Sequence, residues 1–256
     1  MSGIVEQRSP VEGGAILTDG SERGNAALAL LTARPELEAP AASVVARGRG
    51  GAFFLDVAGR RWVARPYRRG GWAALVSRDR YFWTGERNVR SFREWRLLAE
   101  LSARNLPVPA PVAARYRRRG WSYRAELITE RLEGTEPLSA LVERAPVSLS
   151  LWVEIGRTLR RLHDAGAYHA DLNAHNILVD ASGAVFVIDF DRGRLRAPGV
   201  WRDANLARLY RSLLKVCAAL PPDRFGATEW DTLLAAYRAQ PGTGPGGSAS
   251  AGPGAD

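Results

Sequence analysis

Short runs of apolar residues separated by turn signals dominate the chain from about residue 43 to residue 130, and such runs are typical of β-strands. The expected strands cover residues 52–57, 61–66, 112–116 and 121–131. Ala58-Gly59-Arg60 separates the first two strands and predicts a hairpin. Three prolines between residues 107 and 111 exclude a helix before the third strand.

Large apolar residues recur at helical spacing in two further stretches, residues 91–101 and 149–165. Their apolar faces consist of Phe92, Trp95, Leu98 and Leu101, and of Trp152, Ile155, Leu159 and Leu162. Gly166 follows the longer stretch, where a left-handed residue commonly ends a helix. A short helix is also expected at residues 25–32.

These patterns predict an α+β chain with two lobes. We expect an N-terminal extension at residues 1–40, a β-rich N-lobe with one helix at 41–133, and a mainly α-helical C-lobe at 134–240. Residues 241–256 contain mostly glycine, proline, serine and alanine, which bury too little apolar surface to offset the cost of ordering. We therefore expect a disordered tail there.

The stretch from residue 168 to residue 191 carries the candidate chemistry. It contains Asp171, Asn176 and Asp189 around two apolar runs that Asp180-Ala181-Ser182-Gly183 separates, which predicts a β-hairpin. The hairpin would bring Asn176 and Asp189 together as oxygen ligands for magnesium. Asp171 would remain available as a base that takes a proton from an attacking hydroxyl, as in kinase phosphoryl transfer.

The same residues are compatible with a surface hairpin or with a zinc site. Asp and Asn commonly decorate ordinary β-hairpins. The three histidines of the chain, His163, His169 and His175, also lie close together, although Cys217, the one cysteine, is distant from them. We expect His163 and His169 to orient the loop backbone through hydrogen bonds rather than to hold zinc.

A cation for the phosphates of a nucleotide is expected from Arg65. The strand Trp62-Val63-Ala64-Arg65 stands where kinases carry a lysine, and the one lysine of this chain is Lys215. Glu94, on the helix at 91–101, is the expected partner of Arg65. Before the first hairpin, Gly48, Gly50 and Gly51 would let backbone N–H groups approach phosphate oxygens.

The net charge of +9 is concentrated in one segment. Residues 60–93 contain ten arginines against Asp79 and Glu86, a net charge of +8, and this favours anions such as nucleic acid, anionic lipid or a phosphorylated substrate. Aromatic residues are interleaved with these arginines and suit a membrane headgroup region, unless they belong to the N-lobe core. They are Trp72, Tyr81, Phe82 and Trp83.

The single cysteine excludes an internal disulfide framework and fits a reducing compartment. Residues 1–10 lack the features of a signal peptide, and no apolar run approaches the roughly 18 to 20 residues that span a bilayer. We therefore expect a protein without a signal peptide or transmembrane segment, either cytosolic or attached to a surface from the cytosolic side.

Taken together, His169-Ala170-Asp171-Leu172 with Asn176, followed by Asp189-Phe190-Asp191, resembles the catalytic loop and metal-binding triplet of the protein-kinase-like superfamily. The resemblance implies a bilobal protein-kinase-like fold. Ala170 replaces an arginine, Asp191 replaces a glycine, and no Ala-Pro-Glu follows. These departures favour a small-molecule, sugar or lipid kinase over a protein kinase.

Three motifs are similar to the 3-deoxy-D-manno-octulosonic acid (Kdo) kinases of lipopolysaccharide biosynthesis. They are Arg65-Pro66-Tyr67-Arg68-Arg69-Gly70-Gly71, residues 169–176, and Ile188-Asp189-Phe190-Asp191-Arg192-Gly193. The resemblance implies ATP-dependent phosphorylation of a Kdo hydroxyl, O-4, on a lipid A precursor, with Mg as cofactor and no nucleic-acid partner. It also implies peripheral attachment to an anionic membrane surface, the cytoplasmic face of the inner membrane. Arg68, Arg69, Asn173 and His175 lie in these motifs and are candidate substrate-binding residues.

The sequence leaves further functions open. A heptose kinase of the lipopolysaccharide core and an atypical small-molecule or protein kinase would share the same fold. A kinase-like protein that only binds nucleic acid or membrane through its arginines is a non-enzymatic alternative, which the presence of Asp171, Asn176 and Asp189 together disfavours.

Overall fold

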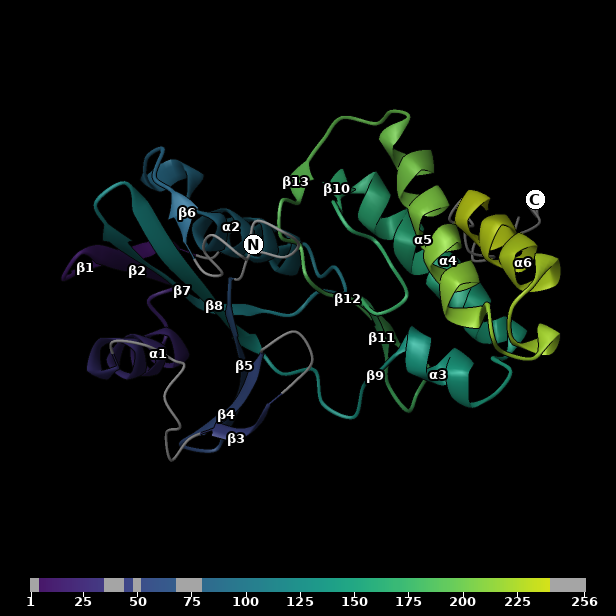
Figure 1. The fold of residues 1–256 in the computed structure, drawn as a ribbon, viewed down its shortest axis with the longest axis horizontal. Helices are drawn as coiled ribbons and strands as arrows, with labels where there is room; N and C mark the ends of the chain where they lie inside the picture. The colour runs from purple at the N-terminus through teal and green to yellow at the C-terminus, as the bar shows by residue number, and fades with distance from the viewer. Residues whose placement is uncertain (1–4, 35–43, 48–51, 68–79, 240–256) are drawn as a thin grey trace, which may run out of the picture.

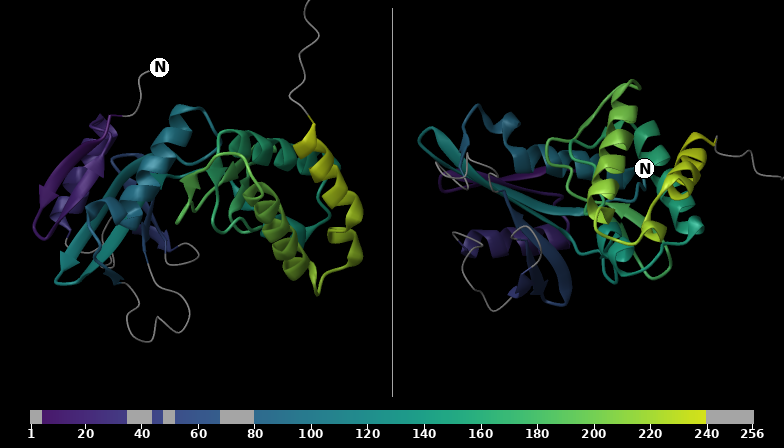
Figure 2. Two further views of the ribbon diagram at one scale, coloured as in Figure 1. Left: turned by 90° about the horizontal axis from the view of Figure 1, so that it is seen from above. Right: turned by 45° about the vertical axis from the view of Figure 1, so that its right-hand side comes forward.

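The computed structural model describes residues 5–34, 44–47, 52–67 and 80–239, which form two lobes (Figure 1). The predicted tail at 241–256 lies outside these residues. The N-lobe is built on one large sheet, and the C-lobe is mainly helical, so the α+β class and the kinase-like, bilobal organisation are confirmed. Figure 2 shows the two lobes side by side in both of its views.

The N-lobe sheet has the strand order β1-β2-β7-β8-β5-β4-β3, and β6 pairs with β8. All of these pairings are antiparallel. The strands are β1 (Gln7–Val11), β2 (Gly14–Thr18), β3 (Val44–Arg47), β4 (Phe53–Val57), β5 (Arg60–Pro66), β6 (Tyr81–Phe82), β7 (Pro111–Arg119) and β8 (Ser122–Glu130). The four strands predicted from the apolar runs are all present.

The β4–β5 hairpin shows why Ala58-Gly59 is a turn. Val57 pairs with Arg60, so the loop has two residues, and both have positive φ, 53° at Ala58 and 75° at Gly59. This is the backbone of a type I′ turn, whose twist matches that of the flanking strands. Arg60, which was expected in the turn, begins β5 instead.

The N-terminal segment is built into the N-lobe sheet. Strands β1 and β2 form a hairpin, β2 pairs with β7, and helix α1 (Glu22–Ala33) follows. The boundary that we expected at residue 41 therefore does not separate an extension from the sheet, and the N-lobe has a second helix. The physical reason is that β2 buries four consecutive residues, Ala15 to Thr18, and so needs cover on both faces of the sheet.

The two N-lobe helices cover opposite faces of this sheet. Helix α2 (Arg90–Ala103) packs Phe92, Trp95 and Leu98 on the face that we call the inner face. Helix α1 packs Ala27 and Leu31 on the outer face, in a separate hydrophobic cluster. Because side chains alternate along a strand, neighbouring residues of β5, β7 and β8 point to different faces.

The C-lobe packs around four helices, α3 (Leu138–Arg144), α4 (Leu149–Asp164), α5 (Trp201–Cys217) and α6 (Ala227–Arg238). Helix α4 matches the predicted stretch, and Gly166 follows it with a φ of 80°. Three short strands form one small sheet, β9 (Glu136–Pro137), β11 (Ile177–Val179) and β12 (Val185–Val187). Strands β10 (Ala167–Tyr168) and β13 (Arg194–Leu195) pair nearby. Within the described ranges, every helix is too short or too polar to cross a bilayer.

Candidate active site

The β11–β12 hairpin brings the two expected metal ligands to the same end. Ile177 pairs with Val187, and the N–H of Ile188 donates to the carbonyl of Asn176 at 2.9 Å. Asp189 comes next in the chain, with a φ of 64°, a left-handed conformation that Asp tolerates better than most residues. The hairpin predicted from the apolar runs is therefore present.

The side chain of His169 holds the loop between β10 and β11 in place through two hydrogen bonds. Its Nδ1 accepts from the backbone N–H of Asp171 at 3.1 Å, so its Nε2 carries the proton and donates to the carbonyl of Ile188 at 2.9 Å. Burial lowers the pKa of this imidazole, which keeps it neutral. His169 thus has the expected role of orienting backbone, and it ties the Asp171 loop to the Asp189 turn.

Helix α5 holds the same loop through three polar residues at helical spacing. Buried Asn205 accepts from the backbone N–H of His169 and donates to its carbonyl, at 3.3 and 2.9 Å. One turn later, Arg208 donates to Asp171 Oδ1 at 3.2 Å. Ser212 accepts from the N–H of Ala174 at 3.1 Å. None of the three was predicted, although their spacing of three and four residues on one helical face is a signal in the sequence.

Asp171 itself is open to solvent. Its side chain is 65% exposed, although Asn173 Nδ2 donates to one carboxylate oxygen at 3.2 Å and Arg208 to the other. Asn173 also accepts from the N–H groups of His175 and Asn176, so it organises the loop. His175 is exposed beside it. A carboxylate that is held but exposed has the properties required of a base that meets an external hydroxyl.

Arg65 on β5 forms the ion pair that the sequence predicted. Its Nη2 lies 2.6 Å from each carboxylate oxygen of Glu94, and the hydroxyl of Tyr67 donates to the same carboxylate. The Glu94 side chain is 2% exposed. Burial alone would lower the pKa of Arg65, but the charges around it, Glu94 first and then Tyr67 and Asp189, together outweigh burial and raise that pKa, so the guanidinium stays charged.

Arg65 also connects the two lobes. Its Nη1 lies 2.5 Å from Asp189 Oδ1, so one guanidinium contacts both the helix α2 carboxylate and the carboxylate at the end of the hairpin. Near it, Arg90 of α2 pairs with Asp191, with Nε 2.8 Å from Oδ1. The motifs and periodicities of the sequence do not indicate this second contact between lobes. It shows that Asp191, where kinases carry a glycine, bonds to the helix that holds Glu94.

The oxygen atoms at this end of the hairpin fit a hard divalent cation. Asn176 donates through Nδ2 to the carbonyl of Asp171 at 3.0 Å, which turns its Oδ1 away from that carbonyl. Asp189 is 39% exposed and adds a carboxylate. An amide oxygen with a carboxylate is the chemistry that magnesium prefers.

Several expected site residues fall outside the described part of the chain. They are Gly48, Gly50 and Gly51 of the glycine-rich stretch, Arg68 and Arg69 of the candidate substrate set, and Trp72.

The described part of the basic segment at 60–93 carries less uncompensated positive charge than its local composition indicates. Of its seven described arginines, four pair with acids from elsewhere in the chain. These pairs are Arg60–Glu22, Arg61–Glu133, Arg65–Glu94 and Arg90–Asp191. Distant acids therefore compensate much of the local excess.

The aromatic residues of that segment divide between core and surface. Tyr81 is buried, and Trp83 packs against the same core with its ring 5.1 Å from that of Tyr116. Phe82 is 75% exposed. Trp83 thus belongs to the N-lobe core, and Phe82 lies at the surface.

The three histidines have separate environments. Buried His163 shares a hydrogen bond of 2.8 Å with the hydroxyl of Tyr237 on α6, so it packs helices together rather than orienting the loop as we expected. Among the described residues, no three His, Cys, Asp or Glu side chains gather as a metal-binding group.

Comparisons with known proteins agree with this geometry. The model of the lipopolysaccharide kinase (Kdo/WaaP) family matches residues 37–237. A protein of Xanthomonas campestris pv. campestris named 3-deoxy-D-manno-octulosonic acid kinase is 55% identical over 170 residues, 66% of this chain and 68% of that protein. One of the same name from Xylella fastidiosa is 52% identical over 170 residues, with the same shares.

A third relative extends the match. It comes from Xanthomonas axonopodis pv. citri, has the same name, and is 52% identical over 206 residues, 79% of this chain and 81% of its own. The family resemblance drawn from the motifs is confirmed. The chain belongs to the lipopolysaccharide kinase (Kdo/WaaP) family and is a phosphotransferase.

Proposed function

We propose that this protein transfers the γ-phosphoryl group of ATP to a hydroxyl of a Kdo residue, O-4, on a lipid A precursor. The shared name of its relatives supports the acceptor. The observation that carries the proposal is the site itself. Exposed Asp171 lies on a loop whose neighbouring turn carries Asp189, and Asp189 contacts the Arg65–Glu94 pair.

Each residue has a role that its surroundings support. Asp171 would accept the proton of the acceptor hydroxyl as that oxygen attacks phosphorus, and its exposure leaves room for the acceptor. Arg65 would contact phosphate oxygens, for which a guanidinium offers a fork of donors. Glu94 and Tyr67 fix the direction of Arg65 from the buried side.

Asn176 and Asp189 would hold magnesium, which neutralises phosphate charge when bound. Asp189→Ala should weaken magnesium binding more than Asn176→Ala, because Asp189 carries the full negative charge. Manganese relaxation measurements on the purified variants would test this without any assay of turnover.

Because its acceptor is lipid-linked, the enzyme would work as a peripheral protein at the cytoplasmic face of the inner membrane. The three remaining described arginines of residues 60–93 support contact with an anionic surface. They are Arg80, Arg87 and Arg93, and within the described ranges they form no ion pair. Each such residue near an anionic leaflet contributes about 1 kcal/mol.

Phosphoryl transfer from labelled ATP to three acceptors in parallel would test the function. These are a Kdo-bearing lipid A precursor, a heptose-bearing core and a generic protein. We expect labelling of the Kdo lipid alone, with the position assigned by NMR of the product. Labelling of the heptose core alone would replace Kdo with heptose as the acceptor, and Asp171→Asn serves as the inactive control.

A further inference from the structure

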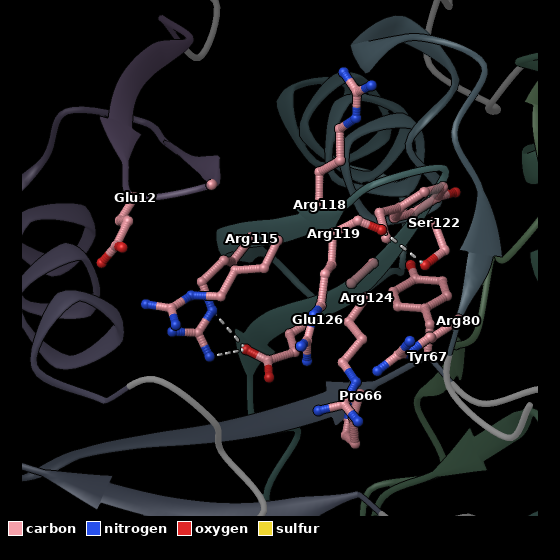
Figure 3. A pocket seen from close by; sticks show the side chains of 14 residues that line it. Glu12, Pro66, Tyr67, Arg80, Arg115, Arg118, Arg119, Ser122, Arg124 and Glu126 are labelled. Atoms are coloured by element: carbon pink, nitrogen blue, oxygen red, sulfur yellow. Dashed lines mark hydrogen bonds and ion pairs between the residues drawn. The ribbon is translucent and has the colours of Figure 1, made fainter.

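A cavity of about 430 Å³ lies on the outer face of the N-lobe sheet, over β7 and β8 (Figure 3). Among the described residues, six arginines and two glutamates line it, although the guanidinium of one arginine, Arg118, lies over Trp83 and away from the rest. The arginines are Arg80, Arg115, Arg117, Arg118, Arg119 and Arg124. The described lining therefore holds more positive than negative side chains.

Strand geometry explains how these arginines gather. Arg115, Arg117 and Arg119 alternate along β7, so all three point to the outer face. Arg117 lies directly opposite Arg124 in the antiparallel β7–β8 ladder. Like charges at facing positions are destabilising.

Among the described residues, the acids that line the cavity are Glu12 and Glu126, and neither forms an ion pair with Arg117 or Arg119. Glu126 is engaged by Arg115, whose Nε lies 2.8 Å from the carboxylate and whose Nη1 also donates to the carbonyl of Leu31 at 2.6 Å. Glu12 lies at the far side, on the β1–β2 turn (Figure 3). Arg115 thus anchors α1 to the sheet, and it uses the acid closest to the centre.

Arg117 carries a hydrogen-bond donor that no described residue satisfies. Its Nε is buried, and the structure gives it no hydrogen bond to any residue it describes. In the same ranges, neither Arg117 nor Arg119 forms an ion pair. A buried N–H group of a cation without an acceptor is costly, and a ligand oxygen would satisfy it.

The cavity is separate from the candidate active site. On β5, Pro66 lines the cavity, whereas Arg65, its neighbour, points to the inner face and contacts Glu94. On β7, the guanidinium of Arg118 stacks on Trp83 at 4.9 Å, away from Arg117. The sheet thus lies between the two sites, which share Tyr67, and a ligand in the cavity would not occupy the position of a nucleotide at Arg65.

We propose that this cavity binds a phosphate ester. Guanidinium forks match phosphate oxygens, and several converge here. The volume falls in the range of small-molecule sites, so the ligand would be a phosphate carrying a small polar group rather than a bare ion. That group is either soluble, as in a sugar phosphate, or the headgroup of a phosphate-bearing lipid.

Calorimetry on the full chain tests the proposal, with a non-hydrolysable ATP analogue saturating the active site. Glycerol 3-phosphate is the soluble probe, and phosphatidylcholine vesicles with and without phosphatidic acid are the lipid probe. We expect Arg117→Gln to weaken binding by about tenfold or more, because it removes a charge-assisted contact. The KM for ATP should not change.

Arg144→Gln is the matched control, since Arg144 is 62% exposed on α3 and its replacement removes the same charge far from the sheet face. If Arg117→Gln does not fold, Arg119→Gln takes its place. Binding of the soluble probe identifies a soluble ligand, and binding of phosphatidic acid vesicles alone identifies a lipid. No binding of either probe, or an equal loss in Arg144→Gln, would overturn the proposal.

A second observation concerns Arg208 on α5. Its Nη1 lies 3.2 Å from Asp171 Oδ1, and its side chain is 48% exposed. Among the residues that the structure describes, Asp171 is the partner of Arg208, through Nη1 alone. An acceptor bound at Asp171 would therefore lie near the remaining donors of this guanidinium.

We infer that Arg208 binds the carboxylate of the acceptor, an inference that rests on the proposed function. Kdo is an acid, whereas heptose has no carboxylate, so an arginine beside the base would favour Kdo. A guanidinium binds a carboxylate through two parallel hydrogen bonds. Arg208 would then be a specificity-determining residue.

Initial-rate kinetics on two acceptors test this role, the Kdo lipid and its analogue with the carboxyl group reduced to an alcohol. We expect Arg208→Gln to raise the KM for the Kdo lipid by about tenfold or more while the KM for ATP stays constant. The KM for the reduced acceptor should differ little between wild type and variant. Arg211→Gln, on the next turn, is the control.

Equal losses on both acceptors would show that Arg208 only supports Asp171, and would overturn the inference. If wild-type protein phosphorylates neither acceptor, the proposed function itself fails. The two failures are therefore distinguishable.

Discussion

The two halves of the candidate active site are held by different kinds of interaction. On the N-lobe side, Arg65 is fixed by an ion pair with Glu94, which is almost completely buried. On the C-lobe side, Asp171 is exposed, its backbone N–H donates to His169, and Asn205 of α5 donates to the carbonyl of His169. A buried ion pair holds the N-lobe half, whereas the C-lobe half depends mainly on hydrogen bonds of neutral groups, with the exposed Arg208–Asp171 pair beside them.

Because of this difference, a substitution on the C-lobe side can change activity without changing stability, whereas one on the N-lobe side should change both. A side chain that its neighbours position, but that does not itself support the fold, can be removed without unfolding the protein. Asp171 is of this kind. Arg65 is not, because its removal would leave Glu94 buried without a counter-charge, and an uncompensated buried charge is strongly destabilising.

The largest expected effect is that of Asp171→Asn. Loss of a general base lowers kcat by about 10²- to 10⁴-fold. The exposed amide should leave the midpoint of thermal unfolding and the affinity for ATP near wild type. Stopped-assay kinetics with calorimetry would measure these quantities, and a near-normal kcat would remove Asp171 from its assigned role.

Arg65→Ala should reduce both activity and stability. We expect a loss of about 3 to 5 kcal/mol in the free energy of unfolding, the cost of breaking a buried pair from one side. Arg65→Lys should keep part of the activity, since lysine restores the charge but not the fork. Urea unfolding with parallel kinetics is the measurement.

A double-mutant cycle with Glu94→Ala sharpens the test. The two losses should be strongly non-additive, as expected for residues in contact. Additive losses would mean that Arg65 and Glu94 do not act as a unit, and that another arginine contacts the phosphates.

The same contrast explains what could be predicted from the sequence. Local periodicity and motif spacing can be read directly from the sequence. They were sufficient to predict the strands, helix α4, the β11–β12 hairpin and the Arg65–Glu94 pair. The placement of β2 against β7 depends on pairing between residues about a hundred positions apart, for which the sequence carries no local signal. For this reason sequence patterns alone leave residues 7–33 in an extension.

Long-range side-chain contacts are missed for a related reason. Arg90 and Asp191 are far apart in the chain, and each alone resembles an ordinary surface charge. The polar face of α5 is different. Asn205, Arg208 and Ser212 share a helical face, so the pattern could have indicated a helix that binds something polar.

The helices of the C-lobe contain a buried histidine that should lower the stability of the protein in acid. Burial lowers the pKa of His163 from 6.5 to about 4. As the pH falls below 6.5, the unfolded chain therefore binds a proton before the folded one does, and stability is lost progressively down to about pH 4. The loss at pH 5 should be about 2 kcal/mol.

His163→Gln tests this assignment. Unfolding free energies measured at pH 7 and pH 5 should differ less in the variant than in wild type, by about the same 2 kcal/mol. His169, whose pKa is also lowered, leaves a residual dependence in the same direction. An unchanged pH dependence in His163→Gln would place the acid sensitivity elsewhere.

The smallest effect should come from the contact that joins the halves, Arg90 with Asp191. Their side chains are 18% and 22% exposed, so solvent screens the pair in part, and Arg90→Gln should cost about 1 kcal/mol of stability. Because α2 also carries Glu94, a looser helix would let Arg65 move relative to Asp189 and should lower kcat by about fivefold. Arg93→Gln, exposed on the same helix, is the control. An equal fall in kcat in that control would show that charge loss on α2, rather than the join between lobes, limits the rate.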